Sequence, residues 1–291
     1  MRWTIGRAIA SAVIGVLGLS GPAAAQEMWL GPTGSAGSFS IELLRPSFRN
    51  GEYGQAPSQS LASGALFATL RIPVRSDLRV ILEVPAARGA FDAQSQYDIP
   101  AQSGFSLGNP YLGVETGALG SAFSVEGGVR IPIVGEPSTS EDEVPLEVGQ
   151  LADLERMEAF APKVAAVSLF TNYRVSGADG FRFRLRGGPL ADVYTSSGDS
   201  DRTVDLWLGY GMQAGYEGRA LSVFGGFAGR TLLSRDAGGV GQRTLDEFVA
   251  SASVDLGGVR PGIMLRLPLD DAMNQVVGHV LGLTLSVPLG K

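Results

Sequence analysis

Apolar and polar side chains alternate with a period of two along much of this chain. The clearest case is the stretch 181–186, which reads FRFRLR. An extended strand puts its three apolar side chains on one face and its three arginines on the other. A strand of a soluble sandwich would bury the apolar row, whereas a strand of a transmembrane barrel turns it toward lipid and turns the arginines toward the lumen.

The same alternation recurs along the chain and predicts about 12 strands, most of them near the length of a tilted membrane strand. Only the two faces of the segment 221–233 are too alike for its inward row to be assigned. The predicted strands are 38–46, 61–73, 78–85, 105–116, 122–133, 165–175, 181–186, 203–216, 221–233, 244–256, 259–269 and 277–289.

The connections between these strands are alternately long and short without exception. Outer-membrane barrels have short turns on the periplasmic side and long loops outside, whereas a Greek-key sandwich has no reason to alternate in this way. The pattern predicts an all-β fold, an antiparallel up-and-down transmembrane β-barrel, formed by a single domain over residues 26–291.

The first residues indicate the compartment. Arg2 and Arg7 precede an uncharged run over 8–19, and the small residues 23–25 follow. This order is typical of a secretory signal peptide, residues 1–25, cleaved after Ala25. The predicted location is the outer membrane, because every later apolar run is too short for a spanning helix.

The composition limits the kinds of molecule that the protein is expected to bind. The chain has no cysteine, so disulfides and thiolate metal sites are excluded. Without Arg2 and Arg7, 21 of the 23 basic residues remain against 29 acidic ones, a net charge of 21 − 29 = −8. Such a charge argues against a nucleic-acid partner. The predicted partners are outer-membrane lipid, the barrel assembly machinery and a small-molecule solute.

Charged side chains on the inward rows are the candidate lumen. They mix both signs, so they predict either a water-filled, weakly selective channel or a network of ion pairs that plugs the barrel. The residues predicted to line the lumen are Arg79, Glu83, Glu126, Arg130, Arg182, Arg184, Arg186, Asp205 and Arg266.

The longest connection, 134–162, is rich in acidic residues. Leu151, Leu154, Met157 and Phe160 recur near helical spacing in it and predict a short amphipathic helix. We expect the loop either to fold into the barrel mouth, with its acids against the arginines of 181–186, or to cap the outer surface. The residues proposed for a constriction are Glu141, Asp142, Glu143, Asp153, Glu155 and Glu158.

The sequence gives little support to a catalytic function. His279 is the only histidine, on the outward row of its strand, and Leu281 occupies the position where a serine two residues away would complete a lipid-hydrolase pair. We predict no catalytic residue, no cofactor and no metal. A non-conducting structural or adhesive barrel and an outer-leaflet lipid-modifying enzyme are the alternatives to a channel.

Two segments carry a resemblance to a known family. Residues 107–115 read LGNPYLGVE, and residues 125–133 read VEGGVRIPI. They resemble a group of outer-membrane barrels that includes the transporter-like proteins named for the meta-pathway of phenol degradation. The resemblance implies a β-barrel that moves small hydrophobic or aromatic compounds.

Overall fold

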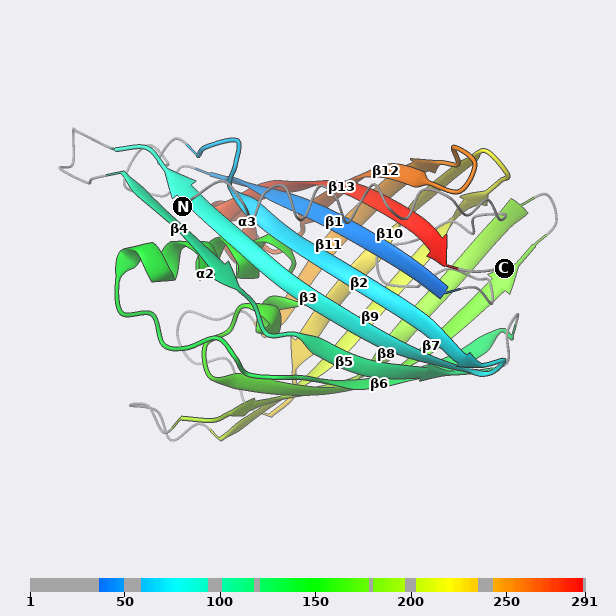
Figure 1. Ribbon diagram of the computed structural model, residues 1–291, viewed down its shortest axis with the longest axis horizontal. Coiled ribbons are helices and arrows are strands. Elements are labelled where there is room, and N and C mark those ends of the chain that lie inside the picture. The colour runs from blue at the N-terminus through cyan, green and yellow to red at the C-terminus, as the bar shows by residue number, and fades with distance from the viewer. Residues whose placement is uncertain are drawn as a thin grey trace.

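The computed structural model describes residues 37–49, 59–93, 101–117, 121–177, 180–196, 203–234 and 243–289. The predicted signal peptide and its cleavage site lie outside these residues. Within them, antiparallel strands form one sheet that closes on itself as a barrel, as predicted (Figure 1).

The strands are long enough to cross a membrane at a tilt. They are β1 (Gly37–Phe48), β2 (Gly64–Arg75), β3 (Leu78–Phe91), β4 (Gln102–Leu107), β5 (Tyr111–Thr116), β6 (Phe123–Arg130), β7 (Val164–Ser176), β8 (Phe181–Tyr194), β9 (Val204–Glu217), β10 (Leu221–Leu232), β11 (Thr244–Val254), β12 (Arg260–Pro268) and β13 (Val277–Leu289). The helices are α2 (Ser140–Ala152), the 3₁₀ turn η2 (Met157–Ala159) and α3 (Asp271–Val276). None of these helices is long and apolar enough to span a membrane.

Apart from β4 and β5, each strand pairs with its neighbours in the chain, and β1 closes the barrel against β13, with Gly37 opposite Leu289. Since β4 and β5 both pair with β3, they share one position, and the 13 strands fill 13 − 1 = 12 positions. The short connections, such as 76–77 and 218–220, lie at one end, and the long ones lie at the other. The predicted alternation is confirmed.

The predicted strand 105–116 is interrupted in the structure. Gly108, Asn109 and Pro110 separate β4 from β5. Gly108 N donates to Pro85 O at 2.9 Å, whereas Asn109 N donates at 2.6 Å to Ala159 O of the long connection, and Pro110 has no N–H to give. Beyond this break β5 pairs with β6, while β4 packs against α2.

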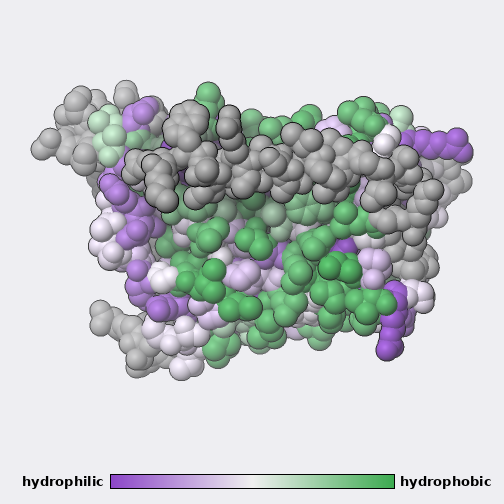
Figure 2. Space-filling view, in the orientation of Figure 1, coloured by the Kyte–Doolittle hydropathy of each residue, from purple (hydrophilic) through white to green (hydrophobic). Residues whose placement is uncertain are grey.

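The outward faces of the strands are apolar and exposed, and the inward faces carry buried charges. Leu281 and Leu283 are 50% and 59% exposed, for example, whereas Arg184 and Arg266 are 0% and 1% exposed. Figure 2 shows the visible apolar side chains as a belt between two hydrophilic ends. The burial pattern also assigns β10, whose inward row includes Phe224 and Arg230.

The helix of the long connection lies earlier than predicted. The predicted short helix in this loop is confirmed, but it does not cover the residues 151–160 that indicated it, because α2 ends at Ala152 and only the turn η2 follows. Thr139 caps α2, its Oγ1 accepting from Asp142 N at 3.3 Å, while Asp153 at the other end pairs with Arg266 of the barrel wall.

Helix α2 packs inside the wall at the end with the long connections (Figure 1). Gly89 and Gly104 stand opposite each other on the inner faces of β3 and β4. A Cβ at Gly89 would lie 2.2 Å from Val144 Cγ1, and one at Gly104 would lie 1.8 Å from Glu141 O. Glycine at these two positions therefore lets the helix backbone approach the sheet.

Candidate functional site

The chain after α2 runs through the interior of the barrel and places Arg156 among three carboxylates. Arg156 pairs with Glu42 of β1, with Glu83 of β3 at 2.8 Å and with Asp153 at 2.7 Å. Its guanidinium carbon lies 3.7 Å from the centroid of the Phe67 ring. One loop side chain thus links two strands that carry carboxylates on their inner faces.

Glu158 reaches the opposite part of the wall. Its Oε1 accepts from Arg130 Nε of β6 at 3.2 Å, and its Oε2 accepts from Arg230 Nη1 of β10 at 3.0 Å. Arg230 also pairs with Asp192 of β8 at 3.2 Å. This carboxylate therefore joins three further strands to the loop.

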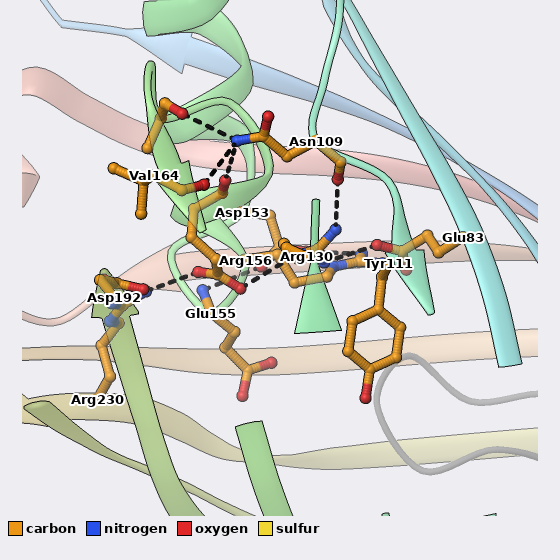
Figure 3. A network of polar contacts seen from close by, with 12 residues as sticks. Glu83, Asn109, Tyr111, Arg130, Asp153, Glu155, Arg156, Val164, Asp192 and Arg230 are labelled. Atoms are coloured by element: carbon orange, nitrogen blue, oxygen red, sulfur yellow. Dashed lines mark hydrogen bonds and ion pairs between the residues drawn. The ribbon is translucent and has the colours of Figure 1, made fainter. Parts of the chain in front are cut away.

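Asp153 completes the arrangement. It accepts from Arg266 of β12 at 2.9 Å and 3.1 Å, and Arg266 also pairs with Glu247 of β11 at 2.7 Å. Charged side chains of five strands, β1, β3, β6, β10 and β12, thus pair with one short loop segment, and Asp192 of β8 and Glu247 of β11 pair in turn with Arg230 and Arg266. Figure 3 shows part of this network. We call this set the ion-pair layer: Glu42, Glu83, Arg130, Asp153, Glu155, Arg156, Glu158, Asp192, Arg230, Glu247 and Arg266.

The layer holds seven carboxyl groups and four arginines, a formal charge of 4 − 7 = −3 if all are ionised. Within the loop, the two acids nearest Arg266 have pKa values that are shifted in opposite directions. Burial opposes ionisation of Asp153, but Arg156 and Arg266 hold its pKa below the ordinary value. Burial, together with the nearby Glu247 and Asp153 carboxylates, raises the pKa of Glu155 to about 8 against the attraction of Arg266. Glu155 thus keeps its proton at neutral pH.

This raised pKa predicts a pH dependence. Between the ordinary value of 4.5 and about 8, folded Glu155 holds a proton that the unfolded chain has lost, so its contribution to the free energy of unfolding falls as pH rises. We expect wild type to lose stability relative to Glu155→Gln across this window. Urea titrations of both proteins at a series of pH values measure the difference, and parallel curves would contradict the assignment.

Asn109 fastens the loop to the wall at the break between β4 and β5. The side chain is fully buried, and its Nδ2 donates at 2.9 Å to Glu158 O and at 2.9 Å to Ala161 O. Its Oδ1 accepts from Val134 N at 2.9 Å. Val134 and Ala161 flank the loop on both sides, so one amide fixes both ends of the segment that enters the barrel.

A cavity of about 110 Å³ lies beside the ion-pair layer. The layer forms part of its lining, together with Arg71, Arg186 and three aromatic side chains, Tyr111, Phe170 and Tyr210. The guanidinium carbon of Arg186 lies 4.2 Å from the centroid of the Phe170 ring. The interior thus combines charged groups with apolar ring faces.

The residues predicted to line the lumen carry side chains on the inner face of the sheet, but they divide into separate groups. Glu83, Arg130 and Arg266 belong to the ion-pair layer. The others pair elsewhere: Arg79 with Glu115 at 3.7 Å, Arg182 with Glu217 at 2.9 Å, Arg184 with Glu217 at 3.6 Å, Arg186 with Glu126 at 3.0 Å, and Asp205 with the Tyr194 hydroxyl at 2.9 Å.

The six acids predicted to form a constriction also fall into two groups. Glu141, Asp142 and Glu143 are exposed in the first turn of α2, whereas Asp153 and Glu158 lie in the ion-pair layer, with Glu155 4.0 Å from Arg266. For two of these acids the expected partners were wrong, because Asp153 and Glu158 pair with arginines of β6, β10 and β12 rather than with the row 181–186. Glu155 is close enough to Arg186 of that row for an electrostatic attraction.

Sequence reasoning missed Asn109, Arg156 and Arg230. The run Gly-Asn-Pro at 108–110 is a turn signal that could have marked the interruption of the strand. Arg156 was overlooked inside an acidic segment, and Arg230 belongs to the strand whose two faces looked alike. Only the register with β9 and β11 turns Arg230 inward.

No protein-family model matches the chain, and no curated protein matches its sequence. Among solved structures, an outer membrane channel from Pseudomonas putida F1 has a TM-score of 0.61 at 13% identity, over 88% of this chain and 96% of that one. The translocator domain of the autotransporter NalP from Neisseria meningitidis has a TM-score of 0.52 at 10% identity, over 97% and 93% of the two chains. The fold is that of outer-membrane β-barrels.

The β domain of a Bordetella autotransporter has the same architecture, with a TM-score of 0.51 at 10% identity, over 87% of this chain and all of that domain. Identities this low bear on the fold alone. In this barrel, the ion-pair layer occupies part of the interior.

Proposed function

We propose that this protein resides in the outer membrane and is a passive channel for small solutes, with the segment 131–163 controlling the width of its lumen. The observation that carries the proposal is the entry of Asp153, Arg156 and Glu158 into the barrel, where they bind charged groups on five strands, β1, β3, β6, β10 and β12. Channels commonly set selectivity with charged side chains at a constriction.

The exposed apolar belt supports the membrane location. Leu82, Val84 and Leu112 on neighbouring strands are 39%, 51% and 45% exposed, and hydrocarbon is the solvent that suits such a surface. The long connections then face outward and the short turns face the periplasm. Outer-membrane lipid and the barrel assembly machinery are the partners that this location requires.

We further propose solutes that are small and aromatic or hydrophobic. The cavity offers the rings of Tyr111, Phe170 and Tyr210, and aromatic faces bind flat apolar solutes through dispersion and stacking. The resemblance of 107–115 and 125–133 to transporter-like barrels named for phenol degradation suggests the same class. Guanidinium groups beside these rings would bind a polar substituent of such a solute.

The ion-pair layer also favours a second candidate, a non-conducting structural or adhesive barrel. In that case the contacts of Arg156 with β1 and β3, and of Glu158 with β6 and β10, close the lumen permanently. The two candidates differ in one measurable property, the conductance of the intact protein.

Single-channel recording in planar bilayers tests the proposal. We expect the wild type to conduct weakly and a deletion of residues 141–158 to raise the conductance several-fold, because the deletion removes the loop members of the ion-pair layer. An equal conductance in both proteins would refute control by the loop. No conductance in wild type, with a large pore after deletion, would favour the structural barrel.

We also keep the prediction that the protein is not an enzyme. The register of β1 and β13 places Ser47 opposite His279 on the outer face, but no hydrogen bond joins the two side chains among the described residues. A nucleophile needs a base within hydrogen-bond reach. Release of labelled fatty acid from phospholipid by wild type, but not by His279→Ala, would contradict the prediction.

A further inference from the structure

Two arginines face outward near the end of the barrel that carries the long connections. Arg45 of β1 follows the fully buried Leu44, and Arg88 of β3 follows Ala87, which is 2% exposed, so both guanidinium groups leave the barrel on its outer side. Gly64 of β2 pairs with Arg88 and has Arg45 Cα 3.6 Å from the position of its missing Cβ. It therefore separates the two arginines in one row.

The row lies where the apolar belt ends. On the short-turn side of it, Leu43 and Val84 are 45% and 51% exposed on the same outward faces. On the other side, Ser47 stands opposite His279. Since neighbouring strands are about 4.8 Å apart, the two arginine backbones are separated by about 10 Å, with the buried Gly64, which has no side chain, between them.

Neither guanidinium group forms a hydrogen bond or an ion pair within the described residues, and Arg45 Nε is buried without a partner. The other members of the row, Leu281 and Phe105, are apolar and 50% and 66% exposed. An arginine on the lipid face is strongly destabilising at the bilayer midplane and much less so near the interface, where lipid headgroups lie. Two such arginines in one row, with no carboxylate partner among the described residues, therefore suit an anionic group of the lipid.

We propose that Arg45 and Arg88 bind the phosphate groups of a phosphorylated glycolipid in the outer leaflet. Guanidinium groups bind phosphate oxygens in a bidentate manner, and two of them about 10 Å apart suit a headgroup that carries two phosphates. The exposed Leu281 and Phe105 at the ends of the row would contact its acyl chains. This inference rests on the proposed membrane location, with the long connections outward.

Native mass spectrometry of the purified full chain in detergent tests the site. The probes are diphosphoryl, monophosphoryl and dephosphorylated lipid A, with phosphatidylglycerol as a single-phosphate lipid of another kind. We expect retention in the order diphosphoryl, monophosphoryl, dephosphorylated, and at least a several-fold loss of the diphosphoryl lipid in the double variant Arg45→Gln/Arg88→Gln. Phosphatidylglycerol should be retained less than the diphosphoryl lipid.

Arg75→Gln is the matched control, because Arg75 is exposed at the short-turn end of β2, away from the row. It should retain the lipid as wild type does. Equal retention of diphosphoryl lipid by the double variant, or equal retention of the dephosphorylated form by wild type, would overturn the phosphate site.

Failure of this inference is separable from failure of the proposed function. A double variant that enters bilayers and conducts like wild type, while keeping full lipid retention, removes only the phosphate site. A wild-type chain that stays soluble without detergent and does not enter bilayers removes the membrane location, and the lipid site with it.

Discussion

Replacing Arg156 with methionine is expected to lower the free energy of unfolding by about 3–5 kcal/mol, the usual effect of removing one partner from a buried ion pair. Asp153 keeps Arg266, and Glu83 keeps Arg130, but the carboxylate of Glu42 loses its ion-pair partner. Methionine retains contact with the Phe67 ring, so the change reports mainly on charge. Urea titration of refolding into lipid vesicles measures it.

Arg182→Met is the matched control for this prediction. Arg182 has 23% of its side chain exposed, and its partner Glu217 also lies 3.6 Å from Arg184, so no carboxylate loses its last cation. We expect a loss of less than about 1 kcal/mol. Equal losses of stability in the two variants would mean that the ion pairs of Arg156 stabilise the barrel no more than those of Arg182.

Replacing Asn109 with aspartate is expected to have an effect of similar size. The amide Nδ2 donates to the carbonyls of Glu158 and Ala161, and a carboxylate oxygen in its place would face both acceptors without a proton to give. Each buried group left unsatisfied costs about 1–3 kcal/mol, so the total for the two carbonyls is about 2–6 kcal/mol. Larger conductance fluctuations should accompany the loss, because the loop is no longer fixed at the wall.

Asn172→Asp provides a control with the same substitution in different surroundings. Asn172 is 1% exposed, and its Oδ1 accepts from Arg186 Nη1 at 3.1 Å, so a carboxylate there gains a charged partner. We expect little loss of stability. If Asn172→Asp is as destabilising as Asn109→Asp, the effect comes from burying any carboxylate and not from the anchoring of the loop.

Most of the barrel could be predicted from the sequence, because a strand with lipid on one side and polar groups on the other must alternate. The rows of β8 and β12 reveal their inward arginines for this reason, and the alternating connections fix the up-and-down topology. On β10 the small residues Gly225, Gly226, Ala228 and Gly229 weaken the contrast between the two faces, so its inward row was not evident.

The ion-pair layer could be predicted only in part. The sequence identifies Asp153, Glu155 and Glu158 as candidates, and Arg130 and Arg266 as inward cations. It does not show which acid pairs with which arginine. Arg266 and Asp153, for example, are 113 positions apart in the chain, and they meet only because the loop folds into the closed barrel.

The sequence by itself therefore determined which side of every predicted strand except 221–233 faces lipid, how many strands close the barrel and at which end the long loops lie, since these follow from local alternation and spacing. Only the tertiary structure decided that the loop enters the barrel, that Arg156 and Asn109 hold it there, and that Arg45 and Arg88 stand in one outward row. Those features depend on the register between strands and on contacts between distant segments, which no local pattern encodes.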